Sequence, residues 1–165
     1  TKAFFLTTLV FVFLLICSTG TQAQTAKANL DQVKLMQQRL GTWESNADKD
    51  TIWFREHQEY GKAYTVNVYY VVKGTKSPFY MSNSSFDSKE GKFKGFTLYA
   101  NGNYTTWIGS WTSEKKFSLD VVQNFKPDAV LAKVEYVSDT PTSMIETRFS
   151  PTGVQILERK YKKVK

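Results

Sequence analysis

Turn-forming residues recur at short, regular intervals from position 47 onward, and no helical period persists between them. This spacing is typical of consecutive strands joined by tight turns. The strongest turn signal is Asn101-Gly102, because both residues tolerate the positive φ of a two-residue hairpin turn. Ten strands are predicted between the turns, at about 42–47, 51–60, 63–73, 78–86, 93–100, 103–112, 116–125, 129–138, 142–150 and 153–163.

Several of these segments alternate between apolar and other residues, as the two-residue period of a strand requires. One face of the segment 64–72 carries Tyr64, Val66, Val68, Tyr70 and Val72. A meander of this length must curl and close, because closure removes the exposed strand edges. The sequence therefore predicts an all-β fold, namely an up-and-down antiparallel β-barrel of about 8–10 strands.

The composition agrees with a strand-rich fold. Aromatic residues make up 15% of the 165 residues, and flat rings pack well on a pleated, half-buried surface. With 41% hydrophobic and 22% charged residues, neither a disordered chain nor a multi-span membrane protein is expected. A short amphipathic helix is predicted over 29–40, ahead of the strands, because Leu30, Val33 and Met36 recur near the helical spacing and Gly41 supplies a stop.

The first 23 residues are predicted to be an export signal. Lys2 precedes an apolar stretch of about 15 residues, too short to span a bilayer, and small polar residues then lead to Ala23. We expect a signal peptide over 1–23, a barrel domain over 24–165, and a periplasmic or secreted protein with no stable membrane insertion. An uncleaved anchor helix and a lipid on Cys17 are the alternatives. Because Cys17 is the only cysteine, the mature domain would form no disulfide.

The formal net charge is +7, from 22 Lys and Arg against 15 Asp and Glu, and this raises the question of nucleic-acid binding. Five of the basic residues lie in 159–165, whereas a nucleic-acid-binding protein spreads them along a face or groove. We therefore expect no nucleic-acid partner. The basic end is interpreted as a solvated terminal strand or, alternatively, as a contact for anionic lipid or polysaccharide.

Gly41-Thr-Trp43, directly after the predicted helix, resembles the Gly-x-Trp opening of lipocalins. In that family the Trp plugs the closed end of the barrel and a basic residue of the last strand covers it, a place that Arg159 or Lys160 would take here. More of the chain resembles a family of uncharacterised secreted bacterial lipocalin-like proteins, through the segments 36–43, 86–93, 106–110 and 159–162. This resemblance implies a barrel with a ligand cavity and carries over no catalytic residue.

A related branch of such barrels binds haem through a Gly-x-Trp-x-Gly-x-Gly start and a His near the C-terminus. Here Glu-Ser-Asn follows Trp43 and the only histidine is His57, so no haem is expected. The chain also lacks the nucleophile and base set, the zinc-ligand set and the glycine-rich phosphate loop of common enzyme classes. We predict no catalytic residue, no metal and no cofactor.

One predicted strand carries a group of residues suited to binding an acid. Trp53, Arg55, His57 and Glu59 share one face of the segment 51–60. If this face points inward, Arg55 and His57 would bind a carboxylate inside an apolar barrel, because a buried cation needs a partner anion. If it points outward, they are solvated charges on the barrel wall. The outward placement is favoured, because Arg and His are mostly exposed in proteins.

The aromatic residues have two interpretations as well, because they either line a cavity or fill a packed core. The predicted ligand-binding residues are Trp43, Trp53, Arg55, His57, Tyr70, Tyr99, Trp107 and Trp111. They would serve a protein that binds a small apolar or amphipathic, lipid-like molecule without catalysis. The first alternative is a structural or interaction module with a filled barrel. The second is an isomerase or hydrolase that uses His57 with a nearby carboxylate.

Overall fold

The computed structural model describes residues 30–165 of the chain. The predicted signal peptide over 1–23, including Cys17, lies outside these residues, and so does the first residue of the predicted helix. Apart from one short helix, the regular structure of the described residues is entirely β. Within 30–165, no helix has the length and the apolar character needed to cross a membrane.

Ten antiparallel strands form the fold, and this confirms the predicted architecture. They are β1 (Gly41–Asn46), β2 (Thr51–Tyr60), β3 (Ala63–Val72), β4 (Thr75–Asp87), β5 (Lys92–Tyr99), β6 (Tyr104–Ser113), β7 (Lys116–Gln123), β8 (Lys126–Thr140), β9 (Ser143–Phe149) and β10 (Gln155–Lys163). β4 begins earlier than predicted and includes Pro78. This proline lies beside an irregularity in the β3–β4 ladder, where a strand tolerates a residue without an N–H.

The helix α2 spans Gln32–Gln37 and is shorter at both ends than the predicted 29–40. Asp31 caps its N-terminus, because the side-chain carboxylate accepts a 3.0 Å hydrogen bond from the Lys34 amide. The Gln32 side chain fastens the helix to β6. Its Nε2 donates to the Trp111 carbonyl (3.1 Å), and its Oε1 accepts from the Trp111 amide (2.7 Å). One glutamine therefore satisfies both backbone groups of a strand residue and sets the position of α2.

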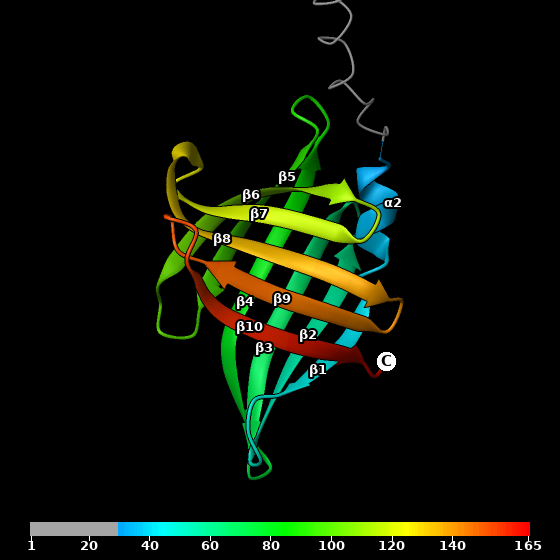
Figure 1. Cartoon of the computed structure of the whole chain (residues 1–165), viewed down its shortest axis with the longest axis vertical. Helices are drawn as coiled ribbons and strands as arrows, with labels where there is room; N and C mark the ends of the chain where they lie inside the picture. Colours follow the sequence, from blue (N-terminus) through cyan, green and yellow to red (C-terminus); the bar gives the residue numbers. More distant parts are fainter. Residues whose placement is uncertain (1–29) are drawn as a thin grey trace, which may run out of the picture.

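Every strand pairs with its neighbours along the chain, and β10 closes the ring by pairing with β1. In Figure 1, β6 to β10 cross the front of the barrel, while β2 to β4 run behind them at a steep angle. Because the ring is closed, the described strands present no free sheet edge of the kind that invites aggregation.

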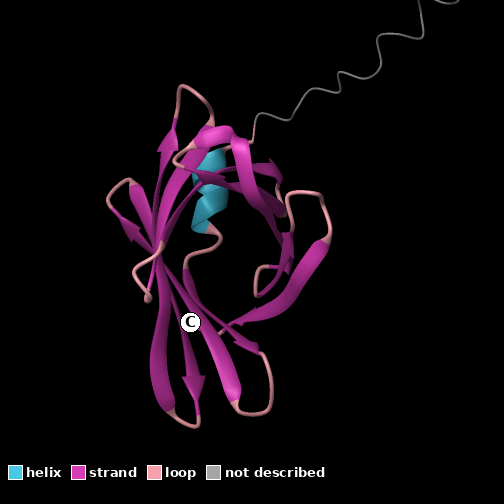
Figure 2. Cartoon of the chain, turned by 90° about the vertical axis from the view of Figure 1, so that its left-hand side faces the viewer, coloured by secondary structure: helices cyan, strands magenta, loops and turns pink. Residues whose placement is uncertain are grey.

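Bulky side chains fill the end of the barrel nearest α2. Phe93 and Phe117 are completely buried, and the Trp111 ring lies 5.5 Å from that of Phe117. Leu35 and Met36 of α2 belong to the same apolar cluster. Figure 2 shows α2 between the strands at this end. The helix and the aromatic cluster together plug one end of the barrel.

Candidate functional site

Two residues of the predicted acid-binding face of β2 point into the barrel, whereas Glu59 of the same face is exposed. Arg55 is only 4% exposed and His57 only 6%. They lie opposite Val68 and Val66 of β3, so they share the inner face with these apolar side chains. The outward placement, which we favoured because Arg and His are mostly exposed in proteins, is therefore wrong for these two residues. The physical reason is that charged side chains are buried when they are paired, and Arg55 has a partner inside the barrel.

That partner is Glu146 of β9, which is 1% exposed. Arg55 Nη1 donates to Glu146 Oε2 at 2.6 Å, and Arg55 Nη2 donates to the Tyr136 hydroxyl at 2.9 Å. Glu146 also accepts a bond from Arg148 Nε (2.9 Å) and one from the Tyr161 hydroxyl (3.2 Å). Three donors from three strands therefore converge on one buried carboxylate.

Glu146 is ionised in this setting. Burial by itself would raise the pKa of its carboxyl group, but the positive charges of Arg55 and Arg148 outweigh burial and hold the pKa below the ordinary value of 4.5. At neutral pH the carboxylate therefore compensates one of the positive charges inside the barrel, and only one.

A second buried guanidinium has no carboxylate partner. Arg39, in the connection between α2 and β1, is 5% exposed and forms no salt bridge within residues 30–165. Its guanidinium carbon lies 4.0 Å from the centre of the Tyr136 ring and 5.3 Å from the centre of the Phe117 ring, so the charge contacts aromatic faces. Burial, reinforced by the charge of Arg55, lowers the pKa of Arg39 to about 10. The group is still positively charged at neutral pH.

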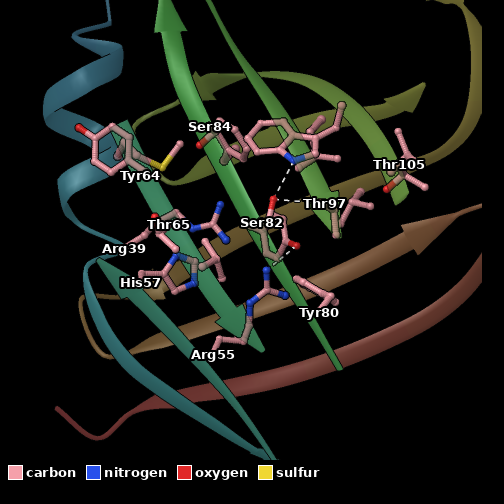
Figure 3. Close-up of a pocket in the computed structure, with 18 of the residues that line it drawn as sticks. Arg39, Arg55, His57, Tyr64, Thr65, Tyr80, Ser82, Ser84, Thr97 and Thr105 are labelled. Carbon is pink, nitrogen blue, oxygen red and sulfur yellow. Dashed lines mark hydrogen bonds between the residues drawn. The ribbon is translucent and has the colours of Figure 1, made fainter. Parts of the chain in front are cut away.

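These basic residues line one cavity of about 80 Å³ inside the barrel. Figure 3 shows Arg39, His57 and Arg55 on one side of it, with Ser82, Thr97 and Thr105 across from them. Apolar side chains complete the wall, among them Met36, Leu40, Val66, Leu119, Val121 and Val134. Arg148 also lines the cavity, and no Asp or Glu among the described residues does. The charged part of the wall is therefore entirely basic.

Three nitrogen atoms of this wall have no hydrogen-bond partner in the described part of the chain, namely Arg39 Nε, Arg55 Nε and His57 Nε2. Such orphans are rare, because buried polar atoms in native proteins are nearly always paired. Burial, followed by the charges of Arg39, Arg55 and Lys163, lowers the pKa of His57 well below 6.5, so its ring is neutral. Arg39, Arg55 and His57 thus each contribute to this wall one buried nitrogen that has no partner among the described residues.

His57 lacks the arrangement that acid–base catalysis requires. A catalytic imidazole needs an orienting group and a reacting group within hydrogen-bond reach. Among residues 30–165, no carboxylate bonds to His57, and the charges that act on its pKa are all basic. The same residues contain no group of three His, Cys, Asp or Glu side chains that could hold a metal ion.

Four of the eight residues predicted to bind ligand line the cavity, and four lie elsewhere. The lining residues are Arg55, His57, Tyr99 and Trp107. Trp53 and Tyr70 lie beside each other on β2 and β3 with ring centres 5.2 Å apart, and Phe79 meets Trp53 edge-on at 4.9 Å. Trp111 packs in the core at the α2 end. The sequence pattern therefore predicted cavity-lining residues on β2, β5 and β6. It did not distinguish tryptophans that line the cavity from tryptophans that pack elsewhere.

Trp43 is 1% exposed and lies beside the end of α2, where its Nε1 donates to the Arg39 carbonyl at 2.8 Å. The predicted cover of this ring by Arg159 or Lys160 is wrong. Lys163 lies over Trp43 at 5.4 Å, and Arg159 lies over Trp53 at 4.3 Å. Lys163 takes this place because it is the direct cross-strand partner of Trp43 on β10.

No sequence pattern identified Arg39, Glu146 or Arg148 in advance. For β9 a signal existed, because alternation places Met144, Glu146 and Arg148 on one face, and an apolar face that carries a Glu and an Arg is suited to a buried ion pair. Arg39 had no comparable signal, because it fell in the last turn of the helix predicted over 29–40, where a basic residue is ordinary and indicates no buried site.

A comparison with protein-family models finds no match to this chain, and a comparison with curated proteins finds no relative. The fold and the site themselves define the class: a closed, ten-stranded, up-and-down β-barrel with a basic cavity in its interior.

Proposed function

We propose that this protein is an exported, lipocalin-like barrel that binds a small amphipathic acid in its cavity without catalysing a reaction. The closed barrel and the motifs within 35–163 support the lipocalin-like assignment. The pattern of residues 1–23 supports export. N-terminal sequencing of the exported protein is expected to begin near Gln24, and a start at Cys17 would contradict the proposal of a free, unlipidated protein.

The observation that carries the proposal is positive charge without counter-charge in the cavity wall. Arg39, Arg55 and Arg148 line the cavity, and Glu146 compensates only one of them. A buried charge without a partner is unfavourable unless an ion of opposite sign binds beside it. An acid group in the cavity would supply that charge and would accept bonds from Arg39 Nε and Arg55 Nε. The apolar part of the wall would receive the remainder of the ligand.

Replacement of Arg39 by Met tests this proposal. Met has a similar length and no charge, so Arg39→Met removes an uncompensated buried cation while filling its space. We expect the ligand-free variant to be more stable than the wild type by about 1–2 kcal/mol, because burial of an unpaired charge opposes folding. We also expect the variant to lose binding of butanoate. Urea denaturation measures the stability, and titration calorimetry measures the binding.

Two controls accompany this test. Butan-1-ol has the same chain length as butanoate without the charge, and it should bind neither protein measurably. Lys160→Met removes a positive charge from a side chain that is 76% exposed, and it should leave stability within about 0.5 kcal/mol and binding unchanged. Equal affinity of wild type and Arg39→Met for butanoate would contradict the proposed site.

A second candidate function is an interaction module with a filled barrel. Two observations favour it: the cavity of about 80 Å³ is small beside the several hundred Å³ of typical ligand sites, and the outer wall over β4 to β6 exposes apolar side chains. The exposed residues are Met81, Phe96, Leu98 and Tyr104. For such a module, Arg39→Met would change stability alone, and neither protein would bind butanoate.

A further inference from the structure

The wall of the cavity across from the arginines carries hydroxyl groups. Ser82 and Ser84 of β4 and Thr97 of β5 are buried, and all three line the cavity. The two serines face the same side because alternate residues of a strand do so. Ser85, the next residue after Ser84, faces the other side and is exposed. A cavity shaped only for hydrocarbon would hold apolar residues at these buried positions.

Part of this wall is a fixed hydrogen-bonded group around Ser82. Its Oγ accepts from Trp107 Nε1 (3.1 Å) and from Thr97 Oγ1 (2.9 Å), and it donates to the Phe96 carbonyl (3.3 Å). Ser84 and Thr105 line the same cavity and take no part in this group. A hydroxyl offers one donor and two acceptors, so these residues are suited to hydrogen bonds with hydroxyl groups of a ligand.

The size of the cavity limits the ligand further. A volume of about 80 Å³ has room for roughly five to eight water-sized groups. A long acyl chain would not fit without displacing the aromatic side chains of the wall, such as Trp107 and the completely buried Phe117. The cavity therefore matches a compact molecule that carries its polar groups on two sides.

We infer that the acid bound in this cavity is a small hydroxycarboxylate, of about three or four carbons, and not a long-chain lipid. Its carboxylate lies against Arg39 and Arg55, and its hydroxyl groups lie against Ser84 and the neighbouring hydroxyls. This inference rests on the proposed function, because it names the ligand class of the same site. It narrows the lipid-like ligand that the sequence led us to expect.

A series of three-carbon acids tests the inference. Propanoate, 2-hydroxypropanoate and 2,3-dihydroxypropanoate share one carbon chain and carry zero, one and two hydroxyl groups. Calorimetric titration of the full mature chain should give an affinity that rises by about 2- to 10-fold for each hydroxyl, the range that one net hydrogen bond supplies. Hexadecanoate should not compete with these acids.

Two adjacent serines provide the matched variants. Ser84→Ala should lose most of the preference for the hydroxylated acids and keep the affinity for propanoate. Ser85→Ala, one residue along β4 and exposed, should behave as the wild type. Because neither variant alters the Arg55–Glu146 pair or the Ser82 group, both are expected to fold.

The outcomes separate the inference from the proposed function. Two results would show that the ligand class is wrong: equal binding of the three acids, or tighter binding of hexadecanoate than of these acids. If Arg39→Met also abolishes that binding, the proposed acid site stands. If no acid binds, or if Arg39→Met binds them as well as the wild type does, the proposed function fails and the inference fails with it.

Discussion

At the scale of single residues, Glu146 is the group on which the interior charges depend. Glu146→Gln keeps the size of the side chain and removes the charge that Arg55 and Arg148 share. We expect a loss of about 3 kcal/mol in the free energy of unfolding at pH 7, because the change leaves buried cations without a counter-ion. Urea denaturation measures it. Glu135→Gln is the control: it breaks a half-exposed pair with Lys116, so it should cost less than about 1 kcal/mol.

The pH dependence of this loss has a defined sign. The pKa of Glu146 is lowered in the folded protein, so its stabilising contribution is present above the unfolded-state value near 4.5 and disappears as the pH falls through the lower, folded-state pKa. The difference in stability between wild type and Glu146→Gln should therefore be constant from pH 6 to 8 and shrink below about pH 4.5. A difference that grows on acidification would contradict the assignment of Glu146 as the ionised partner.

The sequence predicted which residues share a strand face, but not which face points into the barrel. The two-residue period showed that Arg55 and His57 share a strand face, because the pleat determines that directly. It did not show which face is inside, because that depends on Glu146, which lies 91 residues further along the chain from Arg55. Arg39 was missed because the sequence placed it in the last turn of a helix predicted over 29–40, whereas the helix ends at Gln37.

At the scale of elements, the contact between α2 and β6 depends on the Gln32 side chain. Gln32→Ala removes two hydrogen bonds to the Trp111 backbone and leaves a part-buried amide and carbonyl unpaired. We expect a loss of about 1–2 kcal/mol in stability and faster hydrogen exchange at the Trp111 amide. Gln37→Ala is the control, because Gln37 makes one exposed bond to Glu59 (3.2 Å). Equal effects of the two variants would show that Gln32 does not hold the helix.

The strands were well predicted because their boundaries depend on local turn chemistry. Asn101-Gly102 and the other turn signals mark the ends of strands through backbone preferences that a sequence displays directly. The helix was overestimated at its C-terminal end, since Arg39 and Leu40 continue an apolar and basic pattern typical of a last helical turn. In the structure these two residues turn inward and line the cavity instead. Tertiary burial therefore overrides the helical preference of this segment.

At the scale of the whole molecule, the basic excess has two locations. The sequence placed it in the segment 159–165, and much of it does lie there. The fold adds a second location, because Arg39, Arg55 and Arg148 all line the interior cavity although they are distant in the sequence. Only barrel closure brings them together. An interior with more cations than carboxylates is a property of the whole fold, and it favours a small anionic ligand over a macromolecular partner.

The most direct test of this central claim is an NMR titration that observes the Nε–H groups of arginine. Arg39 Nε and Arg55 Nε have no partner in the described structure, whereas Arg148 Nε already donates to Glu146. On addition of 2-hydroxypropanoate, we expect saturable shifts of the Arg39 and Arg55 signals, with a smaller change at Arg148. Unchanged Arg39 and Arg55 signals at saturating acid would contradict an anion site inside the barrel.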